Sequence, residues 1–93
     1  MITILTPTFN RAHLLPRLFE SLVHQTSFNF EWLVIDDGST DETQDLFVEE
    51  AFMSAPFPIR YYKQENGGKH LALNAGVRQA KGDFIFIADS DDC

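Results

Sequence analysis

Short apolar runs alternate with segments of helical periodicity along this chain. Four runs rich in β-branched or aromatic residues have the length and composition of strands: residues 2–6, which resemble a buried strand, 32–35, the weaker 59–62, and 84–88. Between them, apolar residues recur at helical spacing in residues 11–25, in a segment with Leu46, Phe47 and Phe52 on one face, and in residues 70–80. Strands joined by helical crossovers pair in parallel, so the pattern predicts an open α/β fold with helices on the faces of a parallel sheet.

Polar residues, glycine and proline indicate where the helices begin and end. Asn10 is a candidate N-cap of the first helix, and Thr40 or Asp41 of the second. Pro16 falls in the first turns of the first helix and can delay its start. We expect Gly82 to end the last helix as a C′ glycine.

The composition fits one small folded domain. The 93 residues are 44% hydrophobic and 13% aromatic, enough to form a core and to exclude intrinsic disorder. No apolar run reaches the roughly 18 to 20 residues of a membrane span, and the N-terminus lacks the basic segment of a signal peptide. The single cysteine, Cys93, permits neither an internal disulfide nor a Cys-based zinc site, which favours a cytoplasmic location.

The net charge of -7 narrows the choice of partners. Nucleic-acid binding depends on clustered basic residues, so we expect no nucleic-acid partner. An acidic chain can still bind a small phosphorylated ligand if a metal cation lies between the two.

Polar segments follow three of the predicted strands, at residues 6–10, 36–37 and 89–92. In open parallel sheets, ligands bind outside the carboxyl ends of the strands. We therefore expect these three segments to converge on one edge of the sheet and to form the functional site.

Carboxylates are the strongest candidates for chemistry at this edge. Asp89 and Asp91 follow a strand at positions i and i+2, where both can reach one hard cation such as Mg²⁺ or Mn²⁺, although a solvated turn explains the same residues. Asp37 can accept hydrogen bonds from a nucleobase or ribose, or form a tight turn. We interpret residues 39–41 as a turn and helix cap.

Two further candidates are an aromatic residue and a glycine-rich loop. Phe9 can stack on a base or simply pack against the protein. Gly67, Gly68 and Lys69 precede a helix and offer backbone N–H groups and a cation to a diphosphate, or they form a flexible loop with a solvated lysine.

The order of these segments resembles the N-terminal half of family 2 glycosyltransferases with the GT-A fold. The matching segments cover essentially the whole chain: residues 6–11, 21–26, 34–41, 66–69, 72–76, 80–83 and 88–92. Each motif alone is weak, but their occurrence in the family's order is specific. The resemblance implies an open parallel-sheet, Rossmann-like nucleotide-binding fold that breaks off shortly after the strand preceding the D-x-D motif.

The resemblance also implies a binding site for a nucleoside-diphospho-sugar linked to UDP or GDP. Pro7, Thr8 and Phe9 would line the nucleobase, and the family more often has Tyr at position 9. Asp37 would contact the base.

For the diphosphate, the resemblance implies a metal site at the D-x-D motif. Asp89 and Asp91 would hold Mg²⁺ or Mn²⁺, and Asp89 would also belong to the nucleotide-sugar site. Lys69 would approach the phosphates, although the Gly67-Gly68 pair departs slightly from the family's usual loop.

The family's general base and acceptor site lie beyond Cys93, so we expect residues 1–93 to be the incomplete donor-binding part of an inverting, metal-dependent glycosyltransferase. The acceptor, a glycan, lipid or protein, stays open, as does peripheral membrane association of the full-length enzyme. Exposed apolar faces predict self-association of the isolated chain. One alternative is a non-catalytic nucleotide-binding or regulatory module. Another is a sugar nucleotidylyltransferase, whose glycine-rich loop after the first strand is absent from residues 6–11.

Overall fold

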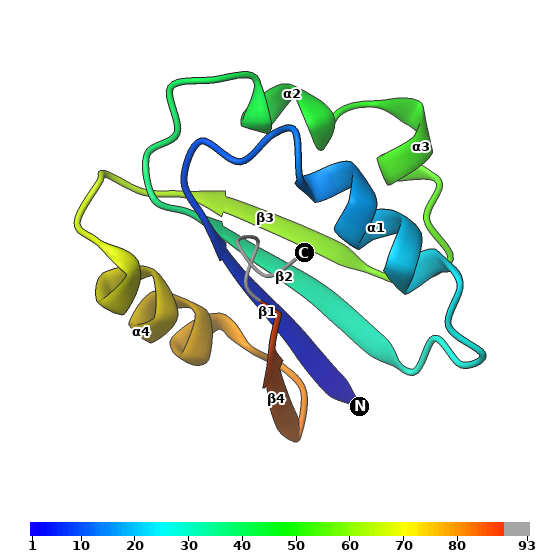
Figure 1. Ribbon diagram of the computed structural model, residues 1–93. Helices are drawn as coiled ribbons and strands as arrows, with labels where there is room; N and C mark the ends of the chain where they lie inside the picture. Colours follow the sequence, from blue (N-terminus) through cyan, green and yellow to red (C-terminus); the bar gives the residue numbers. More distant parts are fainter. Residues whose placement is uncertain (89–93) are drawn as a thin grey trace.

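Four parallel strands form one sheet in the order β3-β2-β1-β4 (Figure 1). The computed structural model describes residues 1–88, except for the side chain of Lys69. Its strands are β1 (Ile2–Thr8), β2 (Phe30–Asp36), β3 (Ile59–Lys63) and β4 (Phe84–Ile87). Every neighbouring pair is parallel, with Ile4 of β1 beside Trp32 of β2 and Phe86 of β4. The predicted open α/β fold is therefore confirmed.

The helices cover the two faces of the sheet unequally. Three of them, α1 (Leu15–Val23), α2 (Thr43–Leu46) and α3 (Glu50–Met53), lie on one face, and α4 (Lys69–Gln79) lies on the other (Figure 1). Within residues 1–88, every helix is too short or too polar to span a lipid bilayer.

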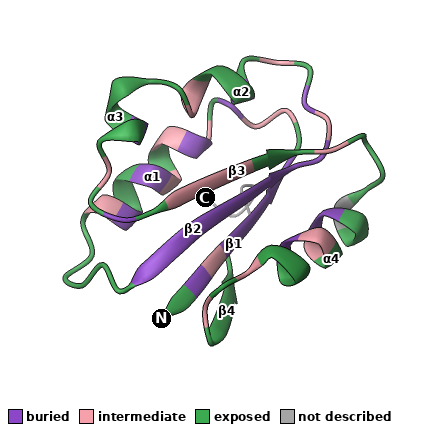
Figure 2. Ribbon diagram, turned by 180° about the vertical axis from the view of Figure 1, so that it is seen from behind, coloured by how far each residue is buried: buried purple, intermediate pink, exposed green. Residues whose placement is uncertain are grey.

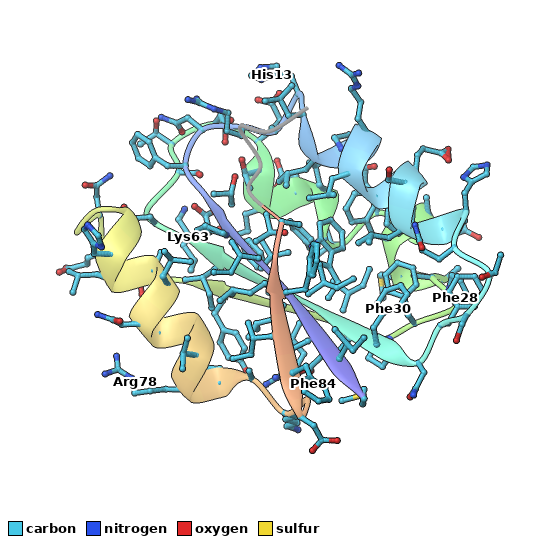
Figure 3. The ribbon with its side chains drawn as sticks, turned by 60° about the horizontal axis from the view of Figure 1, so that its bottom comes forward. His13, Phe28, Phe30, Lys63, Arg78 and Phe84 are labelled. Carbon is cyan, nitrogen blue, oxygen red and sulfur yellow. The ribbon has the colours of Figure 1, made fainter. Side chains whose placement is uncertain are left out.

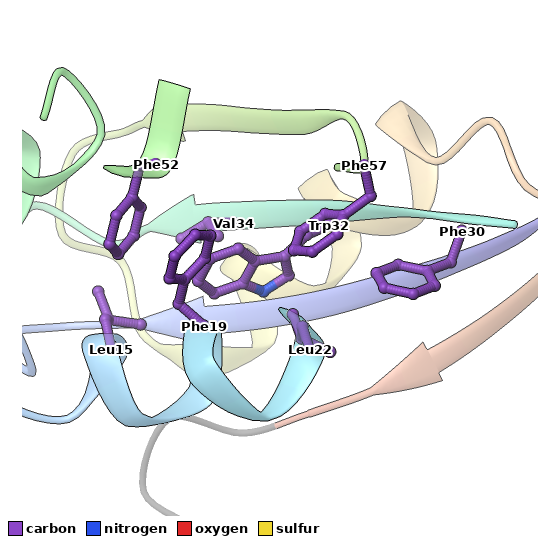
Figure 4. Close-up of a cluster of buried hydrophobic side chains, with 8 residues drawn as sticks. All are labelled: Leu15, Phe19, Leu22, Phe30, Trp32, Val34, Phe52 and Phe57. Carbon is purple, nitrogen blue, oxygen red and sulfur yellow. The ribbon is translucent and has the colours of Figure 1, made fainter. Parts of the chain in front are cut away.

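Alternate residues of β2 enter two separate cores, as the period of a strand requires. Phe30, Trp32 and Val34 face α1 to α3 and pack against aromatic and aliphatic side chains from those helices (Figure 4). In this core the rings of Phe19 and Phe52 stack with their centroids 4.2 Å apart.

The opposite face of β2 packs beneath α4. Leu33 and Ile35 form a smaller core there with Leu5 and Ala72. Gly76 allows the close approach, since a Cβ at this position would lie 2.3 Å from the Cδ1 of Leu5. The two cores together hold β2, whose seven residues are all buried, at the centre of the fold (Figure 2).

Several predicted helix boundaries are wrong. The first helix starts at Leu15, with Pro16 in its first turn as anticipated, but its N-cap is Leu14 and not Asn10. The second predicted helix is two short helices, and the N-cap of α2 is Glu42 because the preceding residues form the turn described below.

The predicted role of Gly82 as a C′ glycine is also wrong. The cap of α4 is Ala80, and Gly82 does not have a positive φ. Gly82 instead passes close to β1, where its N–H donates to the Thr3 hydroxyl at 2.8 Å and a Cβ would lie 2.5 Å from the Thr3 nitrogen.

Strand β4 is the most exposed part of the sheet. The exposed fractions of Phe84 and Phe86 are 73% and 66%, and Ile85 and Ile87 are also exposed (Figure 2). Figure 3 shows Phe84 on this strand at the margin of the molecule. The strand pairs with β1 on one side only, so its other edge and both faces are open in the described part of the chain.

Candidate functional site

The carboxyl ends of β1 and β2 meet at one edge of the sheet. The Asp37 N–H donates to the carbonyl oxygen of Thr8 at 2.8 Å, and the Asn10 N–H donates to the Ser39 hydroxyl at 2.8 Å. Two of the three polar segments expected to converge are thus in contact. The third, with Asp89 and Asp91, lies outside the described residues.

Asn10 joins the loop after β1 to the turn after β2. Its Oδ1 accepts the backbone N–H of Thr40 at 2.8 Å and that of Asp41 at 3.3 Å. Asn10 has a φ of 53°, a left-handed conformation that Asn tolerates better than most residues. Asn10, predicted as a helix cap, therefore connects the loop after β1 to the turn after β2. The sequence around Asn10 does not indicate that its partners are Thr40 and Asp41.

Asp36 is buried and has a structural role. Its Oδ1 accepts the N–H of Ser39 at 2.9 Å, and its Oδ2 accepts the hydroxyl of Tyr61 from β3. Burial, together with this bond to Asp36, raises the pKa of Tyr61 far above its usual value. Asp41 continues the turn by accepting the Thr43 N–H at 3.0 Å, so residues 39–41 form the expected turn, but the N-cap position of α2 is Glu42.

Asp37 points the other way, toward the loop before α4. Its Oδ1 accepts the N–H of Gly67 at 2.9 Å and the side-chain amide of Gln64 at 3.2 Å, and its Oδ2 accepts the N–H of Gly68 at 2.8 Å. Burial alone would raise the pKa of Asp37, but these donors outweigh it and hold the pKa below its ordinary value. The carboxylate stays ionised and ties β2 to the start of α4.

Loop 64–68 packs directly on the turn after β2. Gly38 has a φ of 81°, and a Cβ there would lie 2.8 Å from the nitrogen of Asn66. Gly68 has a φ of 97° and is the N-cap of α4, whose first residue is Lys69. The N–H groups of Gly67 and Gly68, expected to face a diphosphate, donate to Asp37 instead.

The predicted base-lining residues differ in exposure. Pro7 is buried, and Thr8 is only 4% exposed. The Thr8 hydroxyl is buried without a hydrogen-bond partner, the only such side-chain atom reported for the described residues. Phe9 is 41% exposed, so part of its ring is in contact with solvent and part is covered by the protein. Its ring is accessible beside the turn that holds Asp37.

A second polar centre lies near the amino ends of the strands and was not anticipated from the sequence. Glu31 of β2 is buried, and its carboxylate accepts two hydrogen bonds from Arg60, at 2.9 and 3.1 Å. It also accepts the Thr3 hydroxyl at 2.5 Å and the Lys81 N–H at 2.8 Å. Burial works to raise the pKa of Glu31, but these donors lower it to about 2. Glu31 precedes the predicted strand 32–35 and falls inside a strand only because β2 begins at Phe30.

No cluster of three or more potential metal ligands occurs in residues 1–88. Asp36 and Asp37, the carboxylates nearest the strand ends, are already bonded to the protein's own donors. Asp89 and Asp91, the metal ligands that the resemblance implies, follow β4 in the sequence and lie outside the described residues.

Comparison with known proteins identifies relatives over the whole chain. The profile of the family described as glycosyl transferase family 2 matches residues 3–93. An uncharacterized glycosyltransferase of Haemophilus influenzae is 38% identical over 94 residues, covering 100% of this chain and 30% of the relative. Glycosyltransferase GlyG of Streptococcus pneumoniae is 39% identical, covering 99% of this chain and 30% of the relative. The chain thus spans less than a third of these relatives.

Solved structures agree with these sequence relatives. Residues 1–349 of TarS from S. aureus superpose with a TM-score of 0.86 and 30% identity, over 97% of this chain and 27% of that fragment. TarS has been solved with UDP and with UDP-GlcNAc. Mannosyltransferase PcManGT from Pyrobaculum calidifontis, solved with GDP-Man and Mn²⁺, superposes with a TM-score of 0.85 and 29% identity, over 97% of this chain and 27% of PcManGT. The GT-A fold expected from the resemblance is confirmed, and the chain belongs to glycosyl transferase family 2.

Proposed function

We propose that this chain is the donor-binding part of an inverting glycosyltransferase, which transfers a sugar from a nucleoside-diphospho-sugar to an acceptor hydroxyl. The observation that carries the proposal is the meeting of the β1 and β2 ends, where Asp37 lies beside the segment that exposes Phe9. The UDP-GlcNAc complex of TarS and the GDP-Man complex of PcManGT, both similar in fold, support a nucleotide-sugar donor.

The nucleoside would bind over the loop after β1. The partly exposed ring of Phe9 offers a surface on which the base can stack. The buried residues Pro7 and Thr8 would hold the backbone that carries this ring. Asp37 would contact the base at the same edge. Because its carboxylate already accepts three donors from loop 64–68, it would meet the ligand as a rigid, ionised group.

The diphosphate would lie near Asp89, Asp91 and Lys69. Two carboxylates directly after β4 supply the hard oxygen donors that suit Mg²⁺ or Mn²⁺, so the donor set fits such an ion. A bound divalent ion would neutralise the diphosphate and stabilise it as a leaving group. Lys69, at the start of α4, would add a positive charge to the same region.

In the transfer itself, the acceptor oxygen forms a bond to the anomeric carbon while the bond from that carbon to the diphosphate oxygen breaks. The proton of the acceptor hydroxyl goes to a general base, which we assign to the part of the enzyme beyond Cys93. The residues of this chain bind and orient the donor. A cytoplasmic location belongs to the same proposal and rests on the sequence composition.

Titration calorimetry with UDP and GDP, in Mn²⁺ and in EDTA, tests the proposal. We expect the chain to bind either UDP or GDP in Mn²⁺. Binding of the same nucleotide should be at least about tenfold weaker in EDTA, because the nucleotide and the site are both anionic. Repeating the titration with a longer polypeptide that contains this chain controls for a pocket completed by later residues. Failure of that longer protein to bind either nucleotide would overturn the proposal.

A further inference from the structure

A groove with an apolar lining runs between the α2–α3 segment and β3, away from the candidate donor site. It has a volume of about 510 Å³, and its walls include Phe47, Val48, Met53, Phe57, Ile59 and Tyr61. We call it the α2–β3 groove. Neither Phe9 nor Asp37 lines it, so it is independent of the proposed donor-binding function.

The floor of the α2–β3 groove is held in place by aromatic contacts. Phe47 stacks on Tyr61 with ring centroids 4.5 Å apart, and it meets Phe52 edge-on at 5.2 Å. Phe52 and Phe57 are themselves buried in the core beneath (Figure 4). The groove is therefore a preformed feature of the fold and not a gap between loose side chains.

Two apolar side chains that line the groove are largely exposed to solvent. The exposed fraction of Val48 is 70% and that of Met53 is 72%. An apolar patch of this kind with a polar rim is typical of a binding surface. Methionine also adapts its shape to different apolar partners.

The chain segment that forms the α2 and α3 side of the groove carries acidic side chains and no Lys or Arg, and Arg60 of β3 is paired with buried Glu31. The sequence contains no Lys or Arg from residue 18 to residue 59. Four exposed acidic residues interleave with the groove residues along the chain: Glu42, Asp45, Glu49 and Glu50. These four residues, which we call the acidic rim, would repel nucleic acids and anionic lipid surfaces. A polypeptide with apolar anchors and flanking Lys or Arg is the complementary partner.

We propose that the α2–β3 groove binds a basic amphipathic segment of a partner polypeptide. Apolar side chains of the segment pack on Val48, Met53 and the aromatic floor, and its Lys or Arg side chains pair with the acidic rim. The apolar contacts determine where the segment binds, and the charges accelerate association and exclude acidic competitors.

The test uses a fluorescein-labelled amphipathic peptide of about 18 Leu and Lys residues, long enough for five helical turns. Anisotropy measures its binding to the unmodified chain, and the same peptide with Glu in place of Lys is the charge control. We expect the Lys peptide to bind, its affinity to fall as salt is raised, and the Glu peptide not to bind.

Variants then locate the binding surface. The double variant Val48→Gln/Met53→Gln should weaken binding of the Lys peptide about tenfold. Its matched control, Val77→Gln, changes an apolar residue of α4 that is 54% exposed, and it should leave the affinity within about twofold. Glu49→Gln/Glu50→Gln should weaken binding more than Glu20→Gln on α1. Circular dichroism checks that each variant is folded.

If Val77→Gln lost as much affinity as Val48→Gln/Met53→Gln, the peptide would bind nonspecifically and the proposal would be overturned. Equal binding of the Lys and Glu peptides, or unchanged affinity in the folded Val48→Gln/Met53→Gln variant, would also overturn it.

Discussion

The carboxylate of Asp37 accepts the backbone N–H of Gly68 at 2.8 Å, and this bond joins the end of β2 to the first turn of α4. The neighbouring N–H of Gly67 and the side chain of Gln64 complete the arrangement. The residue proposed to contact the nucleoside thus also fixes the loop that precedes Lys69. Any ligand held by Asp37 would be coupled to the position of α4.

Replacing Asp37 is therefore expected to loosen loop 64–68 before any ligand is present. Asp37→Ala should cost about 1–3 kcal/mol of stability, because it leaves the N–H groups of Gly67 and Gly68 without their acceptor. Hydrogen exchange measured by NMR should show faster exchange of these two amides. Asp36→Asn is a useful comparison, since it disturbs the contacts to Ser39 and Tyr61 on the other side of the turn. Unchanged exchange at Gly67 and Gly68 in Asp37→Ala would contradict this prediction.

Glu31 is expected to make stability depend on acid pH. Its pKa falls from 4.5 to about 2 in the folded chain, so the stabilisation is fully present above pH 4.5 and is lost as the pH falls toward about 2. Glu31→Gln should remove this part of the acid dependence. It should also lower stability at neutral pH by about 3–5 kcal/mol, because Arg60 loses its buried partner.

Denaturant unfolding of the wild type and Glu31→Gln at several pH values measures both effects. Glu42→Gln, at an exposed position on the other side of the sheet, serves as the control and should retain the acid dependence. A parallel decline of the wild type and Glu31→Gln below pH 4.5 would rule out the assignment to Glu31.

Phe9 is expected to matter for binding and not for folding. Phe9 is 41% exposed, so Phe9→Ala should cost only about 1 kcal/mol of stability and leave the chain folded. If the ring stacks on the base, the same change should weaken nucleotide binding by about 1–3 kcal/mol. Phe28→Ala, at an aromatic residue 37% exposed and remote from the site, should not affect binding. Calorimetric titration of both variants with UDP and GDP separates the two positions.

The positions of the strands and their parallel pairing follow from the sequence more readily than the contacts at the strand ends. The apolar run at residues 32–35 and the helical spacing around Leu18 and Leu22 reflect burial of one strand and of one helix face, and such burial leaves a pattern in the local sequence. The roles of Asn10 and Asp37 depend on partners about thirty residues away across the sheet. Such partners leave no local pattern, so the N-cap assigned to Asn10 was wrong, whereas the motif order correctly indicated the family.

Glu31 illustrates a different limit of sequence reading. Glu31 lies just before the predicted strand 32–35, and its three donors come from separate parts of the chain: Thr3, Arg60 and the backbone of Lys81. The site residues Asp89 and Asp91 lie outside the described residues, so their role stays a prediction.

The isolated chain is expected to self-associate through β4. This strand exposes Phe84 and Phe86 and leaves one edge unpaired within the described residues, a combination that favours pairing with another chain. Light scattering should show species larger than the 10.6 kDa monomer, increasing with concentration. Phe86→Lys should shift the distribution toward monomer, whereas Leu71→Lys on exposed α4 should not. A monodisperse monomer at high concentration would contradict this prediction.

The D-x-D residues and Asp37 are expected to contribute to nucleotide binding in separable ways. A nucleoside diphosphate approaches a chain of net charge -7, so binding near Asp89 and Asp91 is unfavourable until a divalent cation lies between the charges. Asp91→Ala should therefore weaken binding in Mn²⁺ strongly and leave the weak binding in EDTA nearly unchanged. Asp37→Ala should weaken nucleotide binding both in Mn²⁺ and in EDTA, because Asp37 is proposed to contact the base and not the metal. Calorimetric titration with UDP and GDP, carried out on the longer polypeptide so that the pocket is complete, measures both patterns. Loss of affinity in EDTA for Asp91→Ala equal to that in Mn²⁺ would show that this carboxylate does not act through a metal.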